Sequence, residues 1–295
     1  MRINEPPKTG AMLANRYEVL SLLEEGGMSY VLLAQDYVLG ERVVVKLDRA
    51  TSFESPLAKE ARLLIRARHP SVVRCLGVCE HEDRTLLVLE YLPGECLAHR
   101  IADEGPVCSF PHALDILRPL AAALDELHAR GILHGDVKPG NVVMDRQGRP
   151  VWIDLGLALL PRRERGPQLA LAGTPAYMAP EQVLGLRPDF TSDRYSFAIL
   201  ALEVLTGHRP FPSMATVDLL NAILDCRPRS PSELGLIGDG IDAVFARALA
   251  SNPQHRYPST TAFVDELARA LRSARLQPIG TNDREAPTLR WARAA

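Results

Sequence analysis

Residues 132–145 read Ile-Leu-His-Gly-Asp-Val-Lys-Pro-Gly-Asn-Val-Val-Met-Asp, and after a polar turn residues 151–156 read Val-Trp-Ile-Asp-Leu-Gly. Two carboxylates, Asp136 and Asp154, lie in loops next to short apolar runs of strand length, with Lys138 and Asn141 between them. Oxygen ligands of this kind suit Mg²⁺, which proteins bind through few carboxylates together with substrate phosphates. Phosphoryl transfer depends on alignment and charge neutralisation more than on covalent chemistry. The stretch therefore predicts a site for a metal ion and phosphates.

This stretch resembles the catalytic loop and the magnesium-binding loop of protein kinases in its spacing His134-x-Asp136-x-Lys138-x-x-Asn141, followed by Asp154-x-Gly156. In that family the first aspartate accepts the proton of the substrate hydroxyl group, so the resemblance gives this role to Asp136. It makes Asn141 and Asp154 ligands of the Mg²⁺ ions that bridge the phosphates of ATP. Lys138 would contact the γ-phosphate, and its position favours serine/threonine over tyrosine specificity.

Composition agrees with a soluble globular protein. With 295 residues, of which 46% are hydrophobic and 24% charged, the chain has room for two lobes around a sizeable core. Its net charge of −2 gives no indication of nucleic-acid binding. The sequence contains no run of about 18 apolar residues, which a membrane span would need, and its N-terminus lacks a signal-peptide pattern. The five cysteines form no Cys-x-x-Cys pair and are predicted to be free thiols, so we expect a cytoplasmic protein.

Apolar runs of strand length predict an N-terminal β-sheet after a disordered leader at residues 1–12. Three antiparallel strands are expected at Tyr17–Leu23, Tyr30–Gln35 and Arg42–Leu47. A helix is expected at Leu57–Ala67, and two further strands at Val72–Val78 and Thr85–Glu90. The segment from Glu90 to Gly94 is expected to connect two lobes.

The turn between the first two strands resembles the glycine-rich loop of bacterial kinases, because residues 24–31 read Glu-Glu-Gly-Gly-Met-Ser-Tyr-Val. Glycine lets the backbone approach phosphates closely. The resemblance assigns nucleotide binding to this turn and its flanks, namely to Leu23, Gly26, Gly27, Met28, Ser29 and Val31. Glu24 departs from the pattern, since the family has its first glycine there. An ordinary Gly-Gly hairpin is the alternative interpretation of the turn.

Residues 43–46 read Val-Val-Val-Lys and resemble the kinase strand whose lysine binds the α- and β-phosphates. Glu60 and Glu54 are both candidates for the carboxylate that pairs with Lys46. We favour Glu60, because Pro56 suits the start of a helix and places Glu60 inside it. An exposed surface ion pair is the alternative. Further along the chain, the resemblance places the gatekeeper and the adenine-binding hinge at Leu89 and at Glu90 to Leu92.

The second half of the chain is predicted to be mainly helical. Apolar residues recur at helical spacing in Pro111–Arg130, Thr191–Gly207, Thr216–Leu224, Ile241–Ala250 and Thr261–Leu271. Residues 173–181 read Gly-Thr-Pro-Ala-Tyr-Met-Ala-Pro-Glu and resemble the end of the kinase activation segment, which docks the peptide substrate. The resemblance implies that Thr174 bonds the catalytic aspartate and lysine.

Four residues are predicted to have structural roles. His134 is expected to be packed, because no second histidine lies at metal-ligand spacing. The resemblance makes Asp193 a hydrogen-bond acceptor for the backbone of the catalytic loop. It also pairs Glu181 with Arg256 in a buried ion pair, and breaking one side of such a pair costs about 3 to 5 kcal/mol.

The sequence also suggests how the chain is regulated. Many family members carry, just before the catalytic aspartate, an arginine that binds a phosphorylated activation loop, but this chain has Gly135 there. Residues 157–173 contain no serine, threonine or tyrosine, so nothing before Thr174 can be phosphorylated. We therefore expect activity that is independent of loop phosphorylation. A regulatory partner is expected to act through the tails.

Together these features predict an α+β, bilobal kinase domain at residues 13–272, with an N-lobe at about 13–90, a C-lobe at about 93–272 and a flexible tail at 273–295. The predicted function is an ATP- and Mg²⁺-dependent protein serine/threonine kinase. Two alternatives stay open. One is a pseudokinase acting as a binding module, which Glu24 and Leu155 favour. The other is a small-molecule phosphotransferase of the aminoglycoside or choline kinase type, whose loop often reads His-Gly-Asp but which lacks the segment at 173–181.

Overall fold

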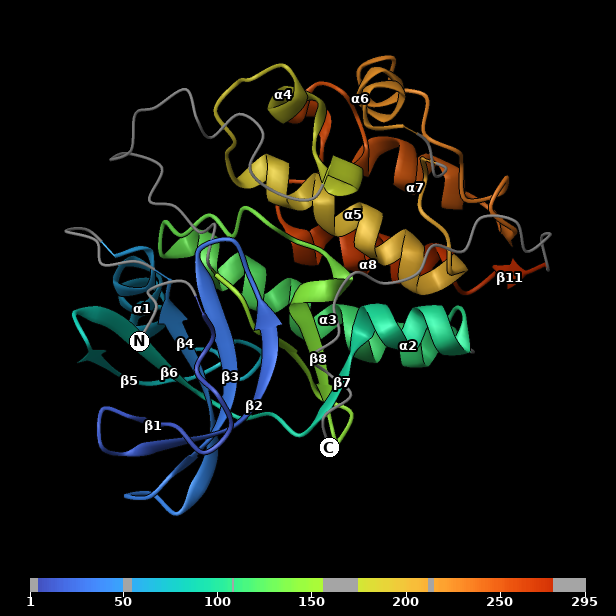
Figure 1. Cartoon of the computed structure of the whole chain (residues 1–295). Helices are drawn as coiled ribbons and strands as arrows, with labels where there is room; N and C mark the ends of the chain where they lie inside the picture. Colours follow the sequence, from blue (N-terminus) through green and yellow to red (C-terminus); the bar gives the residue numbers. More distant parts are fainter. Residues whose placement is uncertain (1–4, 50–54, 108, 156–174, 212–214, 278–295) are drawn as a thin grey trace. The chain divides into compact units, whose positions relative to one another are not determined.

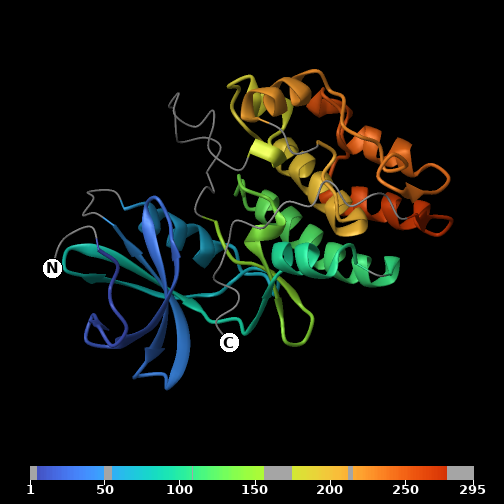
Figure 2. The same cartoon turned by 45° about the vertical axis from the view of Figure 1, so that its right-hand side comes forward.

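The computed structural model of the chain (Figures 1 and 2) describes residues 5–49, 55–107, 109–155, 175–211 and 215–277. These residues form two compact units, the first within 5–95 and 143–155 and the second within 96–142 and 175–277. The first unit is mainly β-sheet and the second mainly helical, so the expected α+β class is confirmed. None of the described helices has the length and hydrophobicity needed to cross a membrane.

A six-stranded antiparallel sheet forms most of the first unit. In the order of the sheet it consists of β1 (Met12–Leu13), β2 (Tyr17–Glu25), β3 (Ser29–Asp36), β4 (Glu41–Asp48), β6 (Arg84–Glu90) and β5 (Cys75–His81). The twisted strands β2, β3 and β4 are seen in blue in both views (Figures 1 and 2). They are the three antiparallel strands expected from the sequence, each longer by one or two residues at an end.

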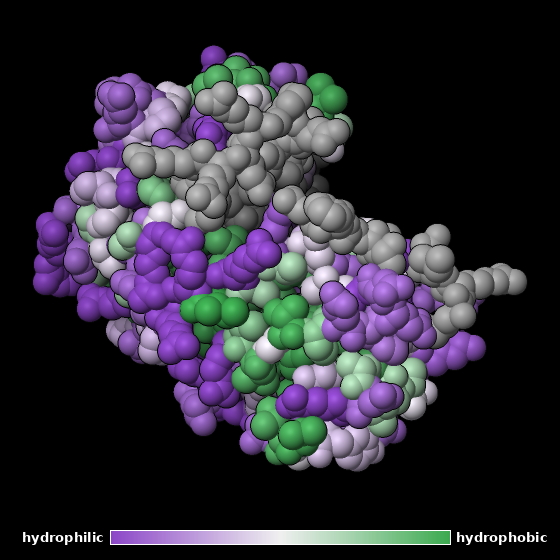
Figure 3. All heavy atoms as spheres, turned by 90° about the vertical axis from the view of Figure 1, so that its left-hand side faces the viewer, coloured by the Kyte–Doolittle hydropathy of each residue, from purple (hydrophilic) through white to green (hydrophobic). Residues whose placement is uncertain are grey.

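The two faces of this sheet carry different side chains, because successive residues of a strand point to opposite faces. One face holds a buried apolar cluster that includes Tyr30, Val45, Leu47 and Val88. Some apolar side chains stay exposed, among them Val38 in the turn between β3 and β4. Figure 3 shows hydrophobic residues gathered in the middle and lower part of one face of the molecule, bordered by hydrophilic residues. The face opposite the cluster carries Lys46 together with buried apolar residues such as Leu87 and Leu89.

Helix α1 (Pro56–Arg66) packs against β4, β5 and β6. Ser55 caps its first turn, because the Ser55 Oγ accepts a hydrogen bond of 3.1 Å from the N–H of Ala58. Pro56 occupies the first helical position, where its missing N–H has no cost. The Ser55 hydroxyl group also donates to the carboxylate of Asp48, which is buried at the end of β4. The start of α1 is thus fastened directly to the sheet.

A short three-stranded sheet has the order β7 (Gly94–Cys96), β8 (Val142–Asp145) and β9 (Pro150–Trp152). Gly94 is required where β7 passes β8, because a Cβ atom there would lie 2.0 Å from the carbonyl oxygen of Met144. The N–H of Trp152 donates to Ser71 O (3.0 Å), and the N–H of Val73 donates to Trp152 O (2.8 Å). These bonds explain why residues 143–155 belong to the first compact unit, whereas the sequence analysis assigned them to the C-lobe.

Helices make up most of the second unit. They are α2 (Leu97–Glu104), α3 (Phe110–Ala129), α4 (Pro180–Val183), α5 (Phe190–Thr206), α6 (Thr216–Leu224), α7 (Ile241–Ala248) and α8 (Thr260–Ala270). Helix α5 is buried on nearly all sides, as its apolar sequence predicts, and packs against α3 and α7. The carboxylate of Asp125 in α3 accepts the N–H groups of Thr260 (2.8 Å) and Thr261 (2.9 Å) at the start of α8. These two hydrogen bonds join α3 to the start of α8.

The ends of the predicted domain differ from expectation. The N–H of Gly10 donates to Val19 O at 2.8 Å, and the N–H of Val19 donates to Ala11 O at 2.9 Å, so ordered pairing begins inside the expected leader. At the other end, β11 (Arg275–Leu276) pairs with β10 (Leu236–Ile237) inside the expected tail. Both segments are held by backbone hydrogen bonds, which composition does not reveal.

The stability of the sheet is expected to depend on Asp36, whose fully buried carboxylate accepts bonds from Arg16 Nε (2.8 Å) and Nη2 (2.7 Å). We expect Asp36→Asn to lower the unfolding free energy at pH 7 by about 2 kcal/mol, less than for a wholly buried pair because Arg16 is partly exposed. The bond from Arg16 holds the pKa of Asp36 below its ordinary value. The pair of Asp36 with Arg16 therefore contributes to the unfolding free energy at pH values above the unfolded pKa of about 3.9. This contribution is lost as the pH falls through the lower pKa of Asp36 in the folded protein. Urea denaturation should show a gap between wild type and variant that shrinks below about pH 4, and a constant gap would contradict the assignment.

Candidate active site

A buried ammonium group links three segments of the first unit. Lys46 Nζ in β4 lies 2.7 Å from Glu60 Oε1 in α1 and 2.8 Å from Asp154 Oδ1, two residues after β9. Lys46 is 7% exposed and Glu60 is 3% exposed, whereas the Asp154 side chain is 40% exposed. Glu60 is thus the carboxylate that the structure pairs with Lys46, and the pair is buried and not a surface one. The rival candidate, Glu54, lies outside the described residues.

Charge and burial act in opposite directions on this cluster. Burial lowers the pKa of Lys46, but the negative charges of Asp154 and Glu60 outweigh it and raise the pKa above its ordinary value. Burial raises the pKa of Glu60, although the lysine opposes the shift. Lys46 therefore remains a positive charge at neutral pH, held in place by two carboxylates from different elements.

The sheet register shows which side chains share a face with Lys46. In the β3–β4 pairing Val31 lies opposite Lys46, and in the β2–β3 pairing Glu24 lies opposite Val31. Leu89 lies opposite Val44, which is two residues from Lys46 and so on the same face. Glu24, Val31 and Lys46 therefore form one row across the sheet, and Leu89 lies in a neighbouring row of the same face. Leu23 is buried at the irregular register just before Glu24. The face opposite the apolar cluster thus carries Glu24 together with candidate nucleotide contacts.

The turn between β2 and β3 holds the other predicted nucleotide contacts. The N–H of Gly26 donates to Ser29 O at 3.0 Å, which closes the turn around Gly27 and the exposed Met28. At the predicted hinge, the N–H of Glu90 donates to Arg74 O (3.0 Å) and Leu92 is half-buried. Both segments thus present backbone groups and apolar side chains.

In the second unit, Asp136, Lys138 and Asn141 form a compact polar cluster. Lys138 Nζ lies 2.7 Å from Asp136 Oδ2, and Asn141 Nδ2 donates to both the backbone O (2.7 Å) and the Oδ2 (3.0 Å) of Asp136. A 3₁₀ turn at Pro139–Asn141 brings Asn141 back to Asp136, and the buried Cys96 Sγ lies 3.7 Å and 3.6 Å from the carbonyl oxygens of Pro139 and Gly140. The catalytic loop predicted from the sequence is therefore held in a fixed shape.

Asp193, near the start of α5, binds the backbone of this loop. Its Oδ2 accepts the N–H of His134 (2.8 Å) and its Oδ1 the N–H of Gly135 (2.9 Å), while His128 Nε2 lies 2.7 Å from Oδ2. Burial would raise the pKa of Asp193, but the bonds from His128 and the loop lower it below its ordinary value. Gly135 has φ of +80°, a left-handed conformation that glycine adopts without strain. His134 is fully buried, in agreement with a packed residue.

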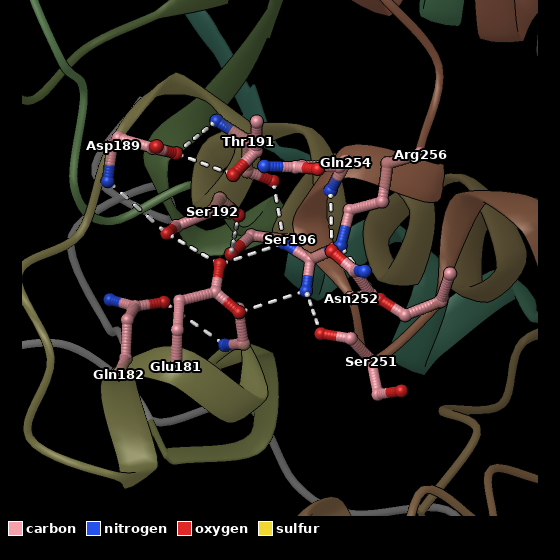
Figure 4. A network of polar contacts seen from close by, with 12 residues as sticks. Glu181, Gln182, Asp189, Thr191, Ser192, Ser196, Ser251, Asn252, Gln254 and Arg256 are labelled. Carbon is pink, nitrogen blue, oxygen red and sulfur yellow. Dashed lines mark hydrogen bonds and ion pairs between the residues drawn. The ribbon is translucent and has the colours of Figure 1, made fainter.

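Figure 4 shows a second polar network of this unit, centred on Glu181 and Arg256. Arg256 Nη1 donates to Glu181 Oε1 (2.7 Å), and Arg256 Nη2 donates to Glu181 Oε2 (2.8 Å). Ser192 Oγ also donates to Glu181 Oε1 at 2.7 Å. The guanidinium group is almost fully buried and reaches the backbone carbonyl oxygens of Ala250, Thr191 and Ser251. All its main hydrogen-bonding directions are used, as in a structural ion pair.

Several residues of these clusters could not be predicted from the sequence. His128 gave no signal because a histidine in a helix has no fixed role, and the sequence around Cys96 indicates only a thiol. Asp48 and Ser55 were missed because no local pattern joins a strand end to a helix cap. Thr174 and residues 156–173 lie outside the described residues, so the structure tests no role for them.

Comparisons with known proteins agree with this geometry. The sequence profile described as "Protein kinase domain" matches residues 17–274. The chain is 32% identical over 285 residues to the serine/threonine-protein kinase PksC of Streptomyces coelicolor, covering 91% of this chain and 51% of that protein. It is 34% identical over 276 residues to PknB of Mycobacterium tuberculosis (88% and 44%) and 32% identical over 276 residues to pkn3 of Myxococcus xanthus (88% and 50%). The chain thus spans about half the length of these relatives.

The Glu181–Arg256 pair gives a direct test of the network in Figure 4. Glu181→Gln keeps the shape of the side chain but leaves the charge of Arg256 buried and unpaired, so we expect the unfolding free energy to fall by about 3 kcal/mol. Glu266→Gln is the matched control, because Glu266 pairs with Arg269 at 2.8 Å on the surface, where such a change costs at most about 1 kcal/mol. Urea denaturation of both variants measures the difference, and equal losses would show that burial of the pair has no effect.

Proposed function

Because the chain belongs to the protein kinase family, we propose that it is a protein serine/threonine kinase that transfers the γ-phosphate of ATP to hydroxyl groups of proteins. The observation that carries the proposal is the buried ammonium group of Lys46, which lies 2.7 Å from the buried Glu60 and 2.8 Å from the partly exposed Asp154. A lysine oriented by two carboxylates is suited to bind phosphates, since its charge is fixed in place before the nucleotide arrives.

The polar cluster of the second unit would carry the proton transfer. Asp136 accepts the proton of the substrate hydroxyl group as the hydroxyl oxygen bonds to the γ-phosphorus and ADP leaves. Lys138 and Asn141 both bond the Asp136 carboxylate and so fix its orientation. Lys138 would also contact the γ-phosphate, and Thr174 would bond Asp136 and Lys138.

The donor atoms fit Mg²⁺. Asn141 uses Nδ2 for both bonds to Asp136, so its Oδ1 faces another direction, and the Asp154 carboxylate is partly open to solvent. An amide oxygen and a carboxylate are hard ligands of the kind that Mg²⁺ prefers beside substrate phosphates. Bound Mg²⁺ supplies charge neutralisation for the phosphate groups. Asn141 and Asp154 would each bind Mg²⁺ through a side-chain oxygen.

Nucleotide binding would use the face of the sheet that carries Lys46. Lys46 would contact the α- and β-phosphates, and the glycine turn at residues 26–29 would approach them with its backbone. Leu23, Val31 and Leu89 would supply apolar contact for the adenine, with Glu90 and Leu92 as hinge residues. Since the reaction requires ATP, and the four described cysteines form no disulfide, we also assign the protein to the cytoplasm. A regulatory partner binding to the terminal segments is part of the same proposal.

The first prediction from this function concerns the reacting groups. Asp136→Asn, Lys46→Met and Asp154→Ala should each reduce phosphoryl transfer by at least about a hundredfold, because these side chains act on the charge that develops in the transition state. Transfer of radiolabelled phosphate from ATP to a generic protein substrate measures this loss. Asp115→Asn, at an exposed position of α3, is the control and should match wild type.

The same assay separates the alternatives. A wild-type chain that binds nucleotide without turnover would indicate a pseudokinase binding module. Transfer to aminoglycosides or choline but not to protein would indicate a small-molecule phosphotransferase. Wild-type turnover in Asp136→Asn would contradict the assigned base.

The second prediction concerns regulation. We expect activity to persist without phosphate on residues 157–174, because Gly135 replaces the arginine that would bind it and residues 157–173 contain no hydroxyl side chain. The measurement is turnover after exhaustive phosphatase treatment, with the phosphatase removed and mass spectrometry confirming the absence of phosphate. Activity that disappears there and returns on rephosphorylation within residues 157–174 would overturn the prediction.

A further inference from the structure

Arg49 directly follows β4 and contacts the β2–β3 turn in four ways. Its backbone N–H donates to Met28 O (2.9 Å), and its Nη1 donates to Gly26 O (3.0 Å). Its Nη2 lies 3.2 Å from Glu25 Oε1, and its guanidinium carbon lies 4.9 Å from the centre of the Tyr30 ring. The two carbonyl groups that it binds stand on either side of Gly27, at the tip of the turn.

We propose that Arg49 is a positioning residue for nucleotide binding, which holds this turn in the conformation that receives the phosphates. The inference rests on the proposed function and adds to it a residue outside the predicted site. Two adjacent glycines give the turn a large conformational freedom, which must be lost when a phosphate binds to its backbone. An anchor that restricts the turn beforehand reduces this loss.

The directions of the peptide groups support the proposal. In a planar trans peptide the C=O and the following N–H point in opposite directions. Because Gly26 O and Met28 O both point to Arg49, the N–H groups of Gly27 and Ser29 point away from it. Backbone N–H groups turned to one side form the kind of concave donor surface that binds anions.

Arg49 itself acts from the other face of the sheet. Its guanidinium group lies over Tyr30, which belongs to the buried apolar cluster, whereas Lys46 lies opposite Val31 on the other face. Arg49 therefore affects the phosphates through the turn and not by contact. Its pairing with Glu25 also offsets one of the two adjacent negative charges, Glu24 and Glu25, that precede the glycines.

Lysine and alanine at position 49 remove different numbers of the contacts that Arg49 makes. The planar guanidinium group can bond a carbonyl and a carboxylate together while it stacks on an aromatic ring. Arg49→Lys keeps the positive charge and the backbone bond to Met28 but loses the stacked, two-point geometry. Arg49→Ala keeps only the backbone bond. We therefore expect a stepwise loss of nucleotide affinity from wild type to the lysine and then the alanine variant.

The experiment measures the affinity of the full chain for a fluorescent ADP derivative with Mg²⁺, together with kcat and KM for ATP. We expect Kd and KM to rise by about threefold in Arg49→Lys and about tenfold in Arg49→Ala, with kcat within about twofold of wild type. A residue that only stabilised the fold would not separate KM from kcat in this way. Arg62→Ala, at an exposed arginine of α1, is the control and should match wild type.

The outcomes separate this inference from the proposed function. If wild type binds nucleotide and turns over while both Arg49 variants keep its Kd and KM, the inference is overturned and the function stands. If wild type binds no nucleotide, the proposed function fails and the inference fails with it. If Arg49→Ala does not fold, as judged by circular dichroism, the result for Arg49→Lys decides, and an unchanged Kd in that variant overturns the inference.

Discussion

The buried ammonium group of Lys46 is the constraint on which the first unit depends. A lysine that is removed from water needs compensating charge, because burying an unpaired ammonium group costs several kcal/mol. Here the compensation comes from Glu60 in α1 and Asp154 after β9, so the helix and the β8–β9 hairpin must both be in place before the charge is satisfied. The interaction that we propose prepares a phosphate site therefore also ties three chain segments together.

The second unit also contains a buried charge, but a negative one. Asp193 is buried as a carboxylate, and it is compensated by two backbone N–H groups of the catalytic loop and by His128. Asp193 and His128 thus help to hold the loop that carries Asp136. Tyr177 and Glu203 add a half-buried pair, with the Tyr177 hydroxyl group 2.5 Å from Glu203 Oε2, and loss of solvent around the two groups raises the pKa of both. Buried polar groups of this kind define one arrangement of the loops because each must find its partner.

The sequence predicted the strands and helices far better than the residues that hold them in place. Strands β2 to β4 and helix α5 follow from local apolar patterns, whereas the roles given to Lys46, Asp136 and Asp154 follow from motifs and stay proposals. Helix α2 and strand β11 were missed, since short elements gain their stability from tertiary pairing and not from local preference. Arg49, Asp48 and His128 could not be predicted, because each acts on a residue distant in sequence and no spacing rule connects the two.

The end of β4 shows why such holding residues gather next to a reacting group. Lys46 bonds Glu60 inside α1, Asp48 bonds the capping residue Ser55 at the start of α1, and Arg49 bonds the β2–β3 turn. Burial raises the pKa of Asp48, and the hydrogen bond from the Ser55 hydroxyl group opposes this shift by stabilising the charged form of the carboxyl group. Strand β4 is held by β3 on one side and by β6 on the other, and three residues at and just after its end, Lys46, Asp48 and Arg49, connect it to a helix and a turn. The position of Lys46 relative to the glycine turn is set within this short stretch of backbone.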